Sequence, residues 1–197
     1  MKIKSKALAL SLCMVLLVVA TVFATTAYLT STDSVKNSFT VGNVRIALDE
    51  ADVDEDGTPV ADAARVQANE YKLIPGHSYT KDPTIQVAET SEDCWIFVKV
   101  ENGLSAIEAE NTPATTIAAQ MAAKGWTAVE GSDNVYAYQD IVQAGTAIVV
   151  FENFTISGTA DVAAYADAEI NVTAYAIQAD GFASASAAWT AAGASLN

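Results

Sequence analysis

The chain has few basic side chains. Ten Lys and Arg stand against 24 Asp and Glu in 197 residues, so the formal net charge is -14. Binding to nucleic acid or to anionic lipid headgroups depends on clustered Lys and Arg, and we find no basic patch in the sequence. The composition therefore argues against a nucleic-acid-binding protein. It suits a protein that stays soluble outside the cell, or one that meets divalent cations.

Histidine and the glycine patterns of nucleotide-binding loops are also scarce. His77 is the only histidine, which excludes a zinc site of the HExxH type, because that motif needs two. A catalytic triad would have to use His77, which lies beside a turn where we expect an exposed side chain without catalytic function. Neither GxxxxGK(S/T) nor GxGxxG after a strand occurs in the sequence.

Only two cysteines are present. Cys13 lies inside a long apolar run, and Leu12 occupies the position where a lipid-anchor signal would need a small residue. This argues against a lipoprotein. Cys94 is the only thiol outside the apolar run, so it has no partner for an internal disulfide. It begins the strand-like segment CWIFVKV, and we expect it to be buried as a small apolar residue.

The N-terminus has the pattern of an export signal. Lys2, Lys4 and Lys6 precede residues 7–32, which carry no charge and whose most apolar part is LALSLCMVLLVVATVFA. A positively charged start, an apolar core and a cleavage site with small residues are typical of a signal peptide. We expect this signal peptide to be a helix. The apolar core is longer than usual, so an uncleaved membrane anchor stays open as the alternative.

Small residues at the end of this run indicate where the signal is cut. We predict cleavage after Ala27, so that Tyr28 becomes the first residue of the mature chain. Cleavage between Ala24 and Thr25 is the alternative. Removal of residues 1–27 takes away three lysines and no acid, which leaves a net charge of -17 (7 minus 24). The rest divides into an extended segment, residues 28–40, and one domain, residues 41–197.

Period-two hydrophobic alternation predicts β-strands through this domain. Gly42, Val44, Ile46 and Leu48 share one face of the first such segment. In CWIFVKVE, Cys94 and every second residue after it face one way, while Trp95, Phe97, Lys99 and Glu101 face the other. Further strand-like segments are NVYAYQDIV, TAIVVFENFTI and AEINVTAYAIQA. Several short strands separated by turn residues favour an all-β fold, an antiparallel β-sandwich.

One or two short helices are expected in addition. In NTPATTIAAQMAAKGW, Thr112 can cap a helix and Pro113 can take its first position. Ile117 and Met121 would then face the core, and Gly125 would end the helix. The tail FASASAAWTAAGASLN is either a short helix or frayed, with Trp189 as its one anchor.

The acidic segment DVDEDG contains the one local motif with a specific chemistry. Asp52, Asp54 and Asp56 alternate before Gly57, as at the start of a calcium-binding loop. Such a loop also needs a bidentate Glu at its twelfth position, and Ala63 is found there. Two hypotheses stay open: Ca²⁺ bound by the three aspartates, which would be the only cofactor, or a solvated acidic loop.

Several segments taken together resemble the TasA/camelysin family of Gram-positive bacteria. They are AYLTSTDSVKNSFTVGNVRIALDE, NEYKLIPGHSYTKDPTIQV, SEDCWIFVKVENG and VTAYAIQADGF. The resemblance implies a jelly-roll β-sandwich, secretion to the cell surface or the biofilm matrix, and a signal peptide removed by the dedicated signal peptidase SipW. It also implies self-association into fibres by donor-strand exchange, in which the N-terminal segment of one subunit completes a sheet of the next.

For this chain, the resemblance makes residues 28–40 both the product of the cut and the donor strand. Its β-prone and apolar residues would be Tyr28, Leu29, Val35 and Phe39, interrupted by Asp33 and Lys36. A strand added to an open sheet edge gains main-chain hydrogen bonds and buries alternate side chains. A donor still tethered to the membrane could not reach a neighbour, so cleavage would control assembly. Contact with the membrane is expected only through the uncleaved signal.

The same family carries a second functional description, a cell-surface metallopeptidase. The sequence departs from what that chemistry needs, since it has one histidine, no zinc motif and no evident pair of base and nucleophile. No catalytic residue can be transferred from the family to this chain. Three hypotheses therefore follow from the sequence: a self-associating structural protein, which we favour and which is not an enzyme; a metallopeptidase; and a calcium-dependent surface-binding module.

Overall fold

The computed structural model describes residues 43–109 and 115–192. The expected signal peptide, both cleavage positions and the expected donor segment, residues 28–40, lie outside these ranges. The strands are β1 (Ile46–Asp49), β2 (Ser78–Thr80), β3 (Thr84–Val87), β4 (Cys94–Asn102), β5 (Trp126–Ala128), β6 (Val135–Tyr138), β7 (Ala147–Val149), β8 (Asn153–Thr155) and β9 (Ile170–Gln178). The helices are η1 (Ser105–Ile107), α2 (Ile117–Ala123), η2 (Val162–Tyr165) and α3 (Ala185–Ala192).

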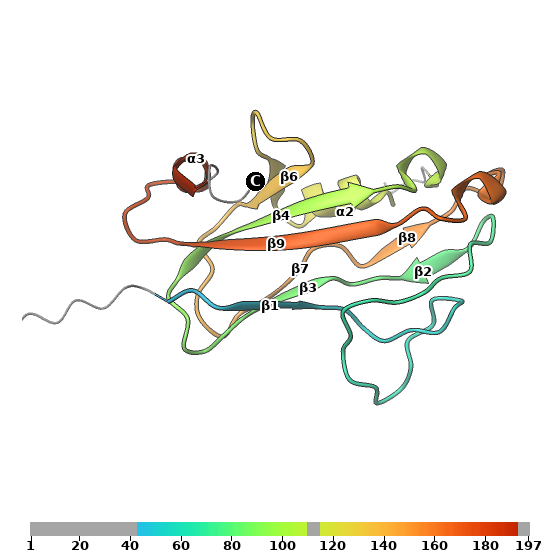
Figure 1. Ribbon diagram of the computed structural model, residues 1–197, viewed down its shortest axis with the longest axis horizontal. Coiled ribbons are helices and arrows are strands. Elements are labelled where there is room, and N and C mark those ends of the chain that lie inside the picture. Colours follow the sequence, from blue (N-terminus) through green and yellow to red (C-terminus); the bar gives the residue numbers. More distant parts are fainter. Residues whose placement is uncertain (1–42, 110–114, 193–197) are drawn as a thin grey trace, which may run out of the picture. The chain divides into compact units, whose positions relative to one another are not determined.

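The strands form three sheets, and every described pair of strands is antiparallel (Figure 1). One sheet has the order β1-β3-β7, a second pairs β2 with β8, and the largest has the order β5-β6-β4-β9. The pair of β4 and β9 is the longest, running without interruption from Cys94 opposite Gln178 to Asn102 opposite Ile170. The prediction of a β-rich, antiparallel fold with short helices is confirmed in this form. Jelly-roll connectivity stays a prediction.

The main core joins residues of different sheets. Ile85 and Val87 of β3 and Ile148 of β7 belong to the same cluster of buried side chains as Ile96 and Val98 of β4. This follows from the alternation in the sequence, because side chains two apart on a strand face the same side. The predicted inward set of β4, which begins with Cys94 and ends with Val100, lies entirely in this cluster. The alternation prediction is confirmed for this strand.

The opposite face of the largest sheet carries a second, smaller core. Trp95 and Phe97 of β4 pack there with Trp189 of α3, whose ring centroid lies 4.9 Å from that of Phe97. The indole N–H of Trp189 donates to Ser132 Oγ at 2.9 Å. Trp189 therefore anchors the C-terminal segment as a helix, which settles the open alternative of a frayed tail for residues 185–192. Lys99 and Glu101 continue the same face as an ion pair.

Helix α2 begins later than the sequence analysis predicted. Its N-cap is Thr116, whose side chain accepts a hydrogen bond from the backbone N–H of Ala119 at 3.3 Å, so the predicted start of the helix is wrong. The predicted cap and first position, Thr112 and Pro113, lie outside the described residues. The carboxylate of Glu108 accepts from the N–H of Ile117 at 3.2 Å, which satisfies another amide of the first turn. Ile117 and Met121 face the core as predicted. Among the described residues, no helix is long and apolar enough to cross a membrane.

Candidate functional site

The outer edge of β9 has main-chain groups that no described strand uses. Ala179 N–H donates to Asp93 O, and Glu169 O accepts from Gly103 N–H, so odd-numbered residues point their backbone groups toward β4. Even-numbered residues must then point theirs away from β4, since backbone direction alternates along a strand. These residues are Ile170, Val172, Ala174, Ala176 and Gln178. No strand of the described ranges pairs with this edge, because β9 is the last strand of its sheet.

Strand β1 has a similar edge on the other sheet. Arg45 O accepts from Ala88 N–H on the β3 side, so the even-numbered residues Val44, Ile46 and Leu48 point their backbone groups outward. Within the described part of the chain, β1 is the last strand of its sheet. The outer edge is used only where β1 ends, at an isolated bridge between Glu50 and Val66.

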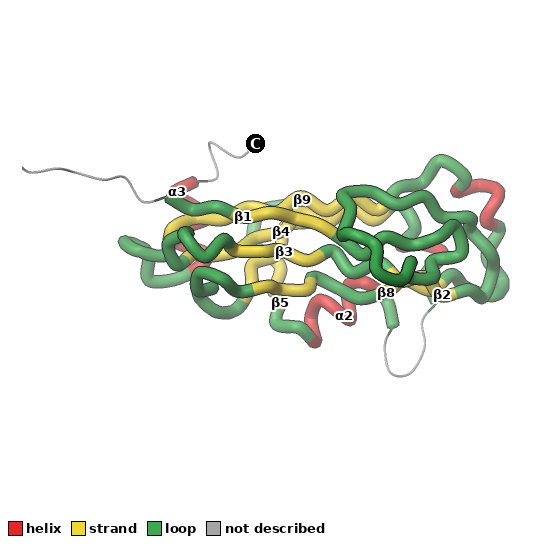
Figure 2. Tube along the Cα trace, turned by 90° about the horizontal axis from the view of Figure 1, so that it is seen from below, coloured by secondary structure: helices red, strands yellow, loops and turns green. Residues whose placement is uncertain are grey.

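The two edges lie side by side (Figure 2). The residues that present free main-chain groups also point their side chains at the main core, where they are only partly buried: Val44, Ile46, Leu48, Ile170, Val172, Ala174 and Ala176. We call these two edges and their apolar side chains the β1–β9 seam. An apolar stripe beside unpaired main-chain groups is the chemistry that an added β-strand recognises.

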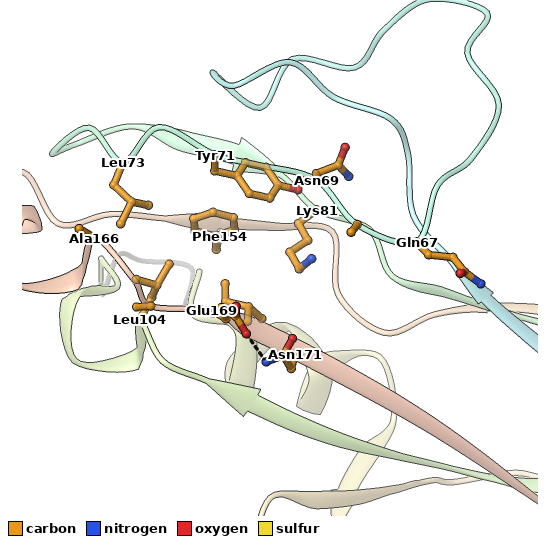
Figure 3. Close-up of a pocket in the computed structure, with 13 residues that line it drawn as sticks. Gln67, Asn69, Tyr71, Leu73, Lys81, Leu104, Phe154, Ala166, Glu169 and Asn171 are labelled. Atoms are coloured by element: carbon orange, nitrogen blue, oxygen red, sulfur yellow. Dashed lines mark hydrogen bonds between the residues drawn. The ribbon is translucent and has the colours of Figure 1, made fainter.

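A pocket of about 260 Å³ lies at the end of the seam where β9 begins (Figure 3). Its apolar wall contains Tyr71, Leu73, Leu104, Phe154 and Ile170. The rings of Tyr71 and Phe154 meet edge to face with centroids 5.3 Å apart. A small neighbouring cleft, lined by residues of both β1 and β9, shares Ile170 with this pocket and continues it along the seam. The pocket and the seam therefore form one feature.

Most polar side chains around the pocket already have hydrogen-bond partners in the protein. Lys81 Nζ lies 2.7 Å from Glu50 Oε2, and Asn69 Nδ2 donates to Glu50 Oε1 at 2.9 Å. On the opposite wall, Asn171 Nδ2 donates to Glu169 Oε2 at 2.9 Å. Burial raises the pKa of Tyr71, whose hydroxyl stays protonated and donates to Thr80 O at 3.1 Å. These polar side chains are therefore satisfied without a charged ligand.

Arg65 fixes the segment that forms one side of this region. Its guanidinium contacts Asp49 Oδ1 at 2.5 Å and Asp82 Oδ2 at 2.9 Å, and it also donates to Thr84 Oγ1 at 2.8 Å. These contacts connect the end of β1 with the start of β3. Asn69, Tyr71 and Leu73 follow Arg65 in the chain and line the pocket, so the contacts of Arg65 position this part of the pocket wall.

The three aspartates expected to bind calcium lie on a tight hairpin. Asp54 Oδ1 accepts hydrogen bonds from the backbone N–H groups of Asp56 at 3.1 Å and Thr58 at 2.8 Å, so its carboxylate stabilises the turn. Asp52 joins the opposite strand of the hairpin through its carbonyl, which accepts from Val60 N–H at 2.9 Å. Within residues 43–109 and 115–192, no three His, Cys, Asp or Glu side chains are grouped to hold a metal ion. Calcium binding stays a prediction.

His77 has a structural partner near the same hairpin. Its Nε2 lies 2.8 Å from Asp56 O, and its ring meets that of Tyr79 edge to face at 4.6 Å. The side chain is half-buried, whereas the sequence analysis expected it to be exposed. The peptidase hypothesis would need a catalytic partner for His77, and the contacts described for this residue supply only a carbonyl and a phenol ring.

Cys94 is fully buried, as the sequence predicted. Burial raises the pKa of its thiol to about 11, with a further contribution from the charge of Asp93. A thiol needs its thiolate form and exposure to act as a nucleophile. Cys94 therefore acts as a core residue.

The sequence did not predict the pocket, nor that β1 and β9 would be edge strands. Lys81 and Glu50 are 31 positions apart, and nothing in either local segment predicts that they meet. The strand-like alternation did place Ile170, Val172, Ala174 and Ala176 on one face. It could not say that β9 would be an edge strand, because strand order depends on pairing between distant segments.

Comparison with known proteins leaves the family open. No family model matches the chain, and no curated protein and no solved structure matches it either. The resemblance to the TasA/camelysin family therefore stays a hypothesis based on the segments quoted above. The β1–β9 seam and the signal-peptide pattern of the N-terminus are the two features that bear on function.

Proposed function

We propose that this chain is an exported structural protein of the cell surface or extracellular matrix that self-associates into fibres or oligomers by strand addition. The signal pattern of residues 1–27 supports export. The acidic composition supports solubility outside the cell. In this proposal the fold is a jelly-roll, and the chain is a member of the TasA/camelysin family.

The observation that carries the proposal is the β1–β9 seam. Folded proteins usually cover or interrupt long edge strands, because unpaired N–H and C=O groups can pair with strands of other chains. Strand β9 has nine residues and is an edge among the described strands, with partly buried apolar side chains along its inner face. An added strand would pair with the main-chain groups of β9 and cover these side chains.

Residues 28–40 are the donor in this proposal. Leu29, Val35 and Phe39 are all odd-numbered, so an extended segment would present them on one face, which also carries Asp33. Thirteen extended residues span about 43 Å, which is more than the length of β9. Cleavage after Ala27, or after Ala24, would release this segment from the membrane through the dedicated signal peptidase, and so would control assembly.

Two experiments test the proposal. The intact mass and N-terminal sequence of the secreted protein should give a chain that begins at Tyr28; a full-length chain in the membrane would overturn export. The chain that begins at Tyr28 should form fibres or oligomers visible by electron microscopy and sedimentation, and the same chain without residues 28–40 should stay monomeric. Equal assembly of both would exclude this segment as the donor.

A further inference from the structure

We infer that the pocket at the Ile170 end of the seam receives the side chain of Phe39 from a second copy of the chain, and that subunits consequently join head to tail. This inference rests on the proposed function and specifies its partner residue and polarity. It starts from the pocket, which combines an apolar, partly aromatic wall with polar groups that are already paired.

The size and chemistry of the pocket suit one apolar side chain. Its volume of about 260 Å³ falls below the range of about 300–1,000 Å³ that is usual for small-molecule sites. The rings of Tyr71 and Phe154 favour an aromatic occupant, because offset and edge-to-face contacts add to the burial of area. Phe39 is the only phenylalanine in residues 28–40, and it shares its face with Leu29 and Val35. Tyr28 lies on the opposite face of the same extended segment.

Chain length requires that this Phe39 belong to another molecule. Asn43 O accepts from Glu92 N–H, and the neighbouring Asp93 pairs with Ala179, so the described chain starts at the end of β9 far from the pocket. Four Cα-to-Cα steps connect Phe39 to Asn43 and span at most about 14 Å. The eight steps along β9 from Gln178 to Ile170 cover about 26 Å. Phe39 therefore cannot reach the pocket of its own molecule.

The position of Phe39 fixes the direction of the donor. With Phe39 in the pocket, residues 38 to 29 run along β9 toward Gln178, which makes the donor antiparallel to β9. All six described strand pairs of this fold are antiparallel, and this pairing is the more stable kind. A parallel donor would instead leave Phe39 near Ala179 and bring Leu29 toward the pocket.

Direction decides the type of assembly. In the antiparallel arrangement, the donor segment leaves the acceptor molecule at the pocket end of the acceptor. It then enters its own domain at the Ala179 end of that domain, so the pocket end of one molecule meets the Ala179 end of the next. Such heterologous contacts continue from subunit to subunit, and they form an open filament unless the rotation between subunits closes them into a ring. In the parallel arrangement, the two Ala179 ends would meet, and a reciprocal exchange would close a dimer. The pocket thus selects head-to-tail contacts over a reciprocal pair.

Disulfide trapping between two separately purified chains tests the inference. Both chains begin at Tyr28; one carries Phe39→Cys and the other Ala168→Cys, which lies in the pocket wall. A disulfide forms only when the two Cα atoms come within about 7 Å. We expect a disulfide-linked dimer in this mixture on a non-reducing gel. Ala166→Cys, also in the pocket wall, is the second variant if the first fails to fold.

The matched control places the acceptor cysteine at the other end of the seam, as Ala176→Cys. A disulfide between Phe39→Cys and Ala176→Cys, without one at the pocket, would overturn the inferred direction but keep strand addition. Assembly of the unmodified chain with no disulfide in any mixture would overturn the pocket assignment. If the unmodified chain that begins at Tyr28 does not assemble at all, the proposed function itself fails.

Discussion

Lys81 and Glu50 form a buried ion pair, with Nζ and Oε2 2.7 Å apart and side chains that expose only 11% and 6% of their surface. Removing one partner leaves the other charge buried without compensation. We expect Lys81→Met to lower the free energy of unfolding by about 3–5 kcal/mol. Urea denaturation followed by fluorescence measures this loss.

An exposed ion pair serves as the control for that experiment. Lys124 Nζ lies 2.7 Å from Glu152 Oε1, but the Glu152 side chain is 63% exposed. Lys124→Met should therefore cost about 1 kcal/mol or less. Equal losses in Lys81→Met and Lys124→Met would contradict the conclusion that burial makes the Lys81–Glu50 pair costly to break.

Position 57 requires glycine for two reasons, its left-handed backbone conformation and the close approach of Tyr79. Its φ is +74°, and a Cβ there would lie 2.8 Å from the Cα of Tyr79. Gly131 has a similar φ of +76° but no atom within 4 Å of such a Cβ. We expect Gly131→Ala to cost about 1–2 kcal/mol for the left-handed backbone alone. Gly57→Ala should cost about 1–3 kcal/mol more, as overpacking does, when both variants are compared by thermal unfolding. Similar losses would exclude the close contact with Tyr79.

The thiol of Cys94 should react only when the protein unfolds. It is fully buried, and burial raises its pKa to about 11, so little thiolate is present near neutral pH. With the chain that begins at Tyr28, an aromatic disulfide reagent should label no thiol in the native state at pH 8. In urea it should label one. Rapid labelling of the folded protein would show that the core around β4 opens locally.

Glu108 should make stability depend on pH. Burial raises the pKa of its carboxyl above the ordinary value of 4.5, so the folded state binds this proton more tightly than the unfolded state. The contribution of Glu108 to stability is therefore complete below pH 4.5 and is lost as pH rises through the raised pKa. Glu108→Gln removes this titration. In urea titrations, the free energy of unfolding of the wild type should fall relative to that of Glu108→Gln as the pH rises above 4.5 through the raised pKa. A difference between the two proteins that does not change with pH would contradict the raised pKa of Glu108.

The sequence predicted what depends on local periodicity. Alternation in CWIFVKVE placed Ile96 and Phe97 on opposite faces of one strand, and the two cores of the structure contain them separately. The core face of helix α2 was predicted correctly, but its start was wrong, because more than one threonine in this segment can serve as a cap. The structure uses Thr116, and Glu108, nine positions before Ile117, accepts from the amide of Ile117, a contact that the local sequence does not show.

Strand order and the pocket could not be predicted from the sequence. Both depend on contacts between segments far apart in the chain, such as Glu50 with Lys81 and β1 with β9. The resemblance to the TasA/camelysin family implies a donor in residues 28–40. In the proposed function, the seam is its acceptor.

One substitution tests strand addition to β9 most directly. The N–H of Ala174 points away from β4, so Ala174→Pro removes a donor from the free edge and leaves the ladder between β4 and β9 intact. Thr173→Pro is the matched control, because its N–H points toward β4 and its loss should disrupt folding. We predict that Ala174→Pro, in the chain that begins at Tyr28, stays folded and monomeric by circular dichroism and sedimentation velocity, while the unmodified chain forms fibres. Fibre formation by folded Ala174→Pro at the rate of the unmodified chain would contradict the account.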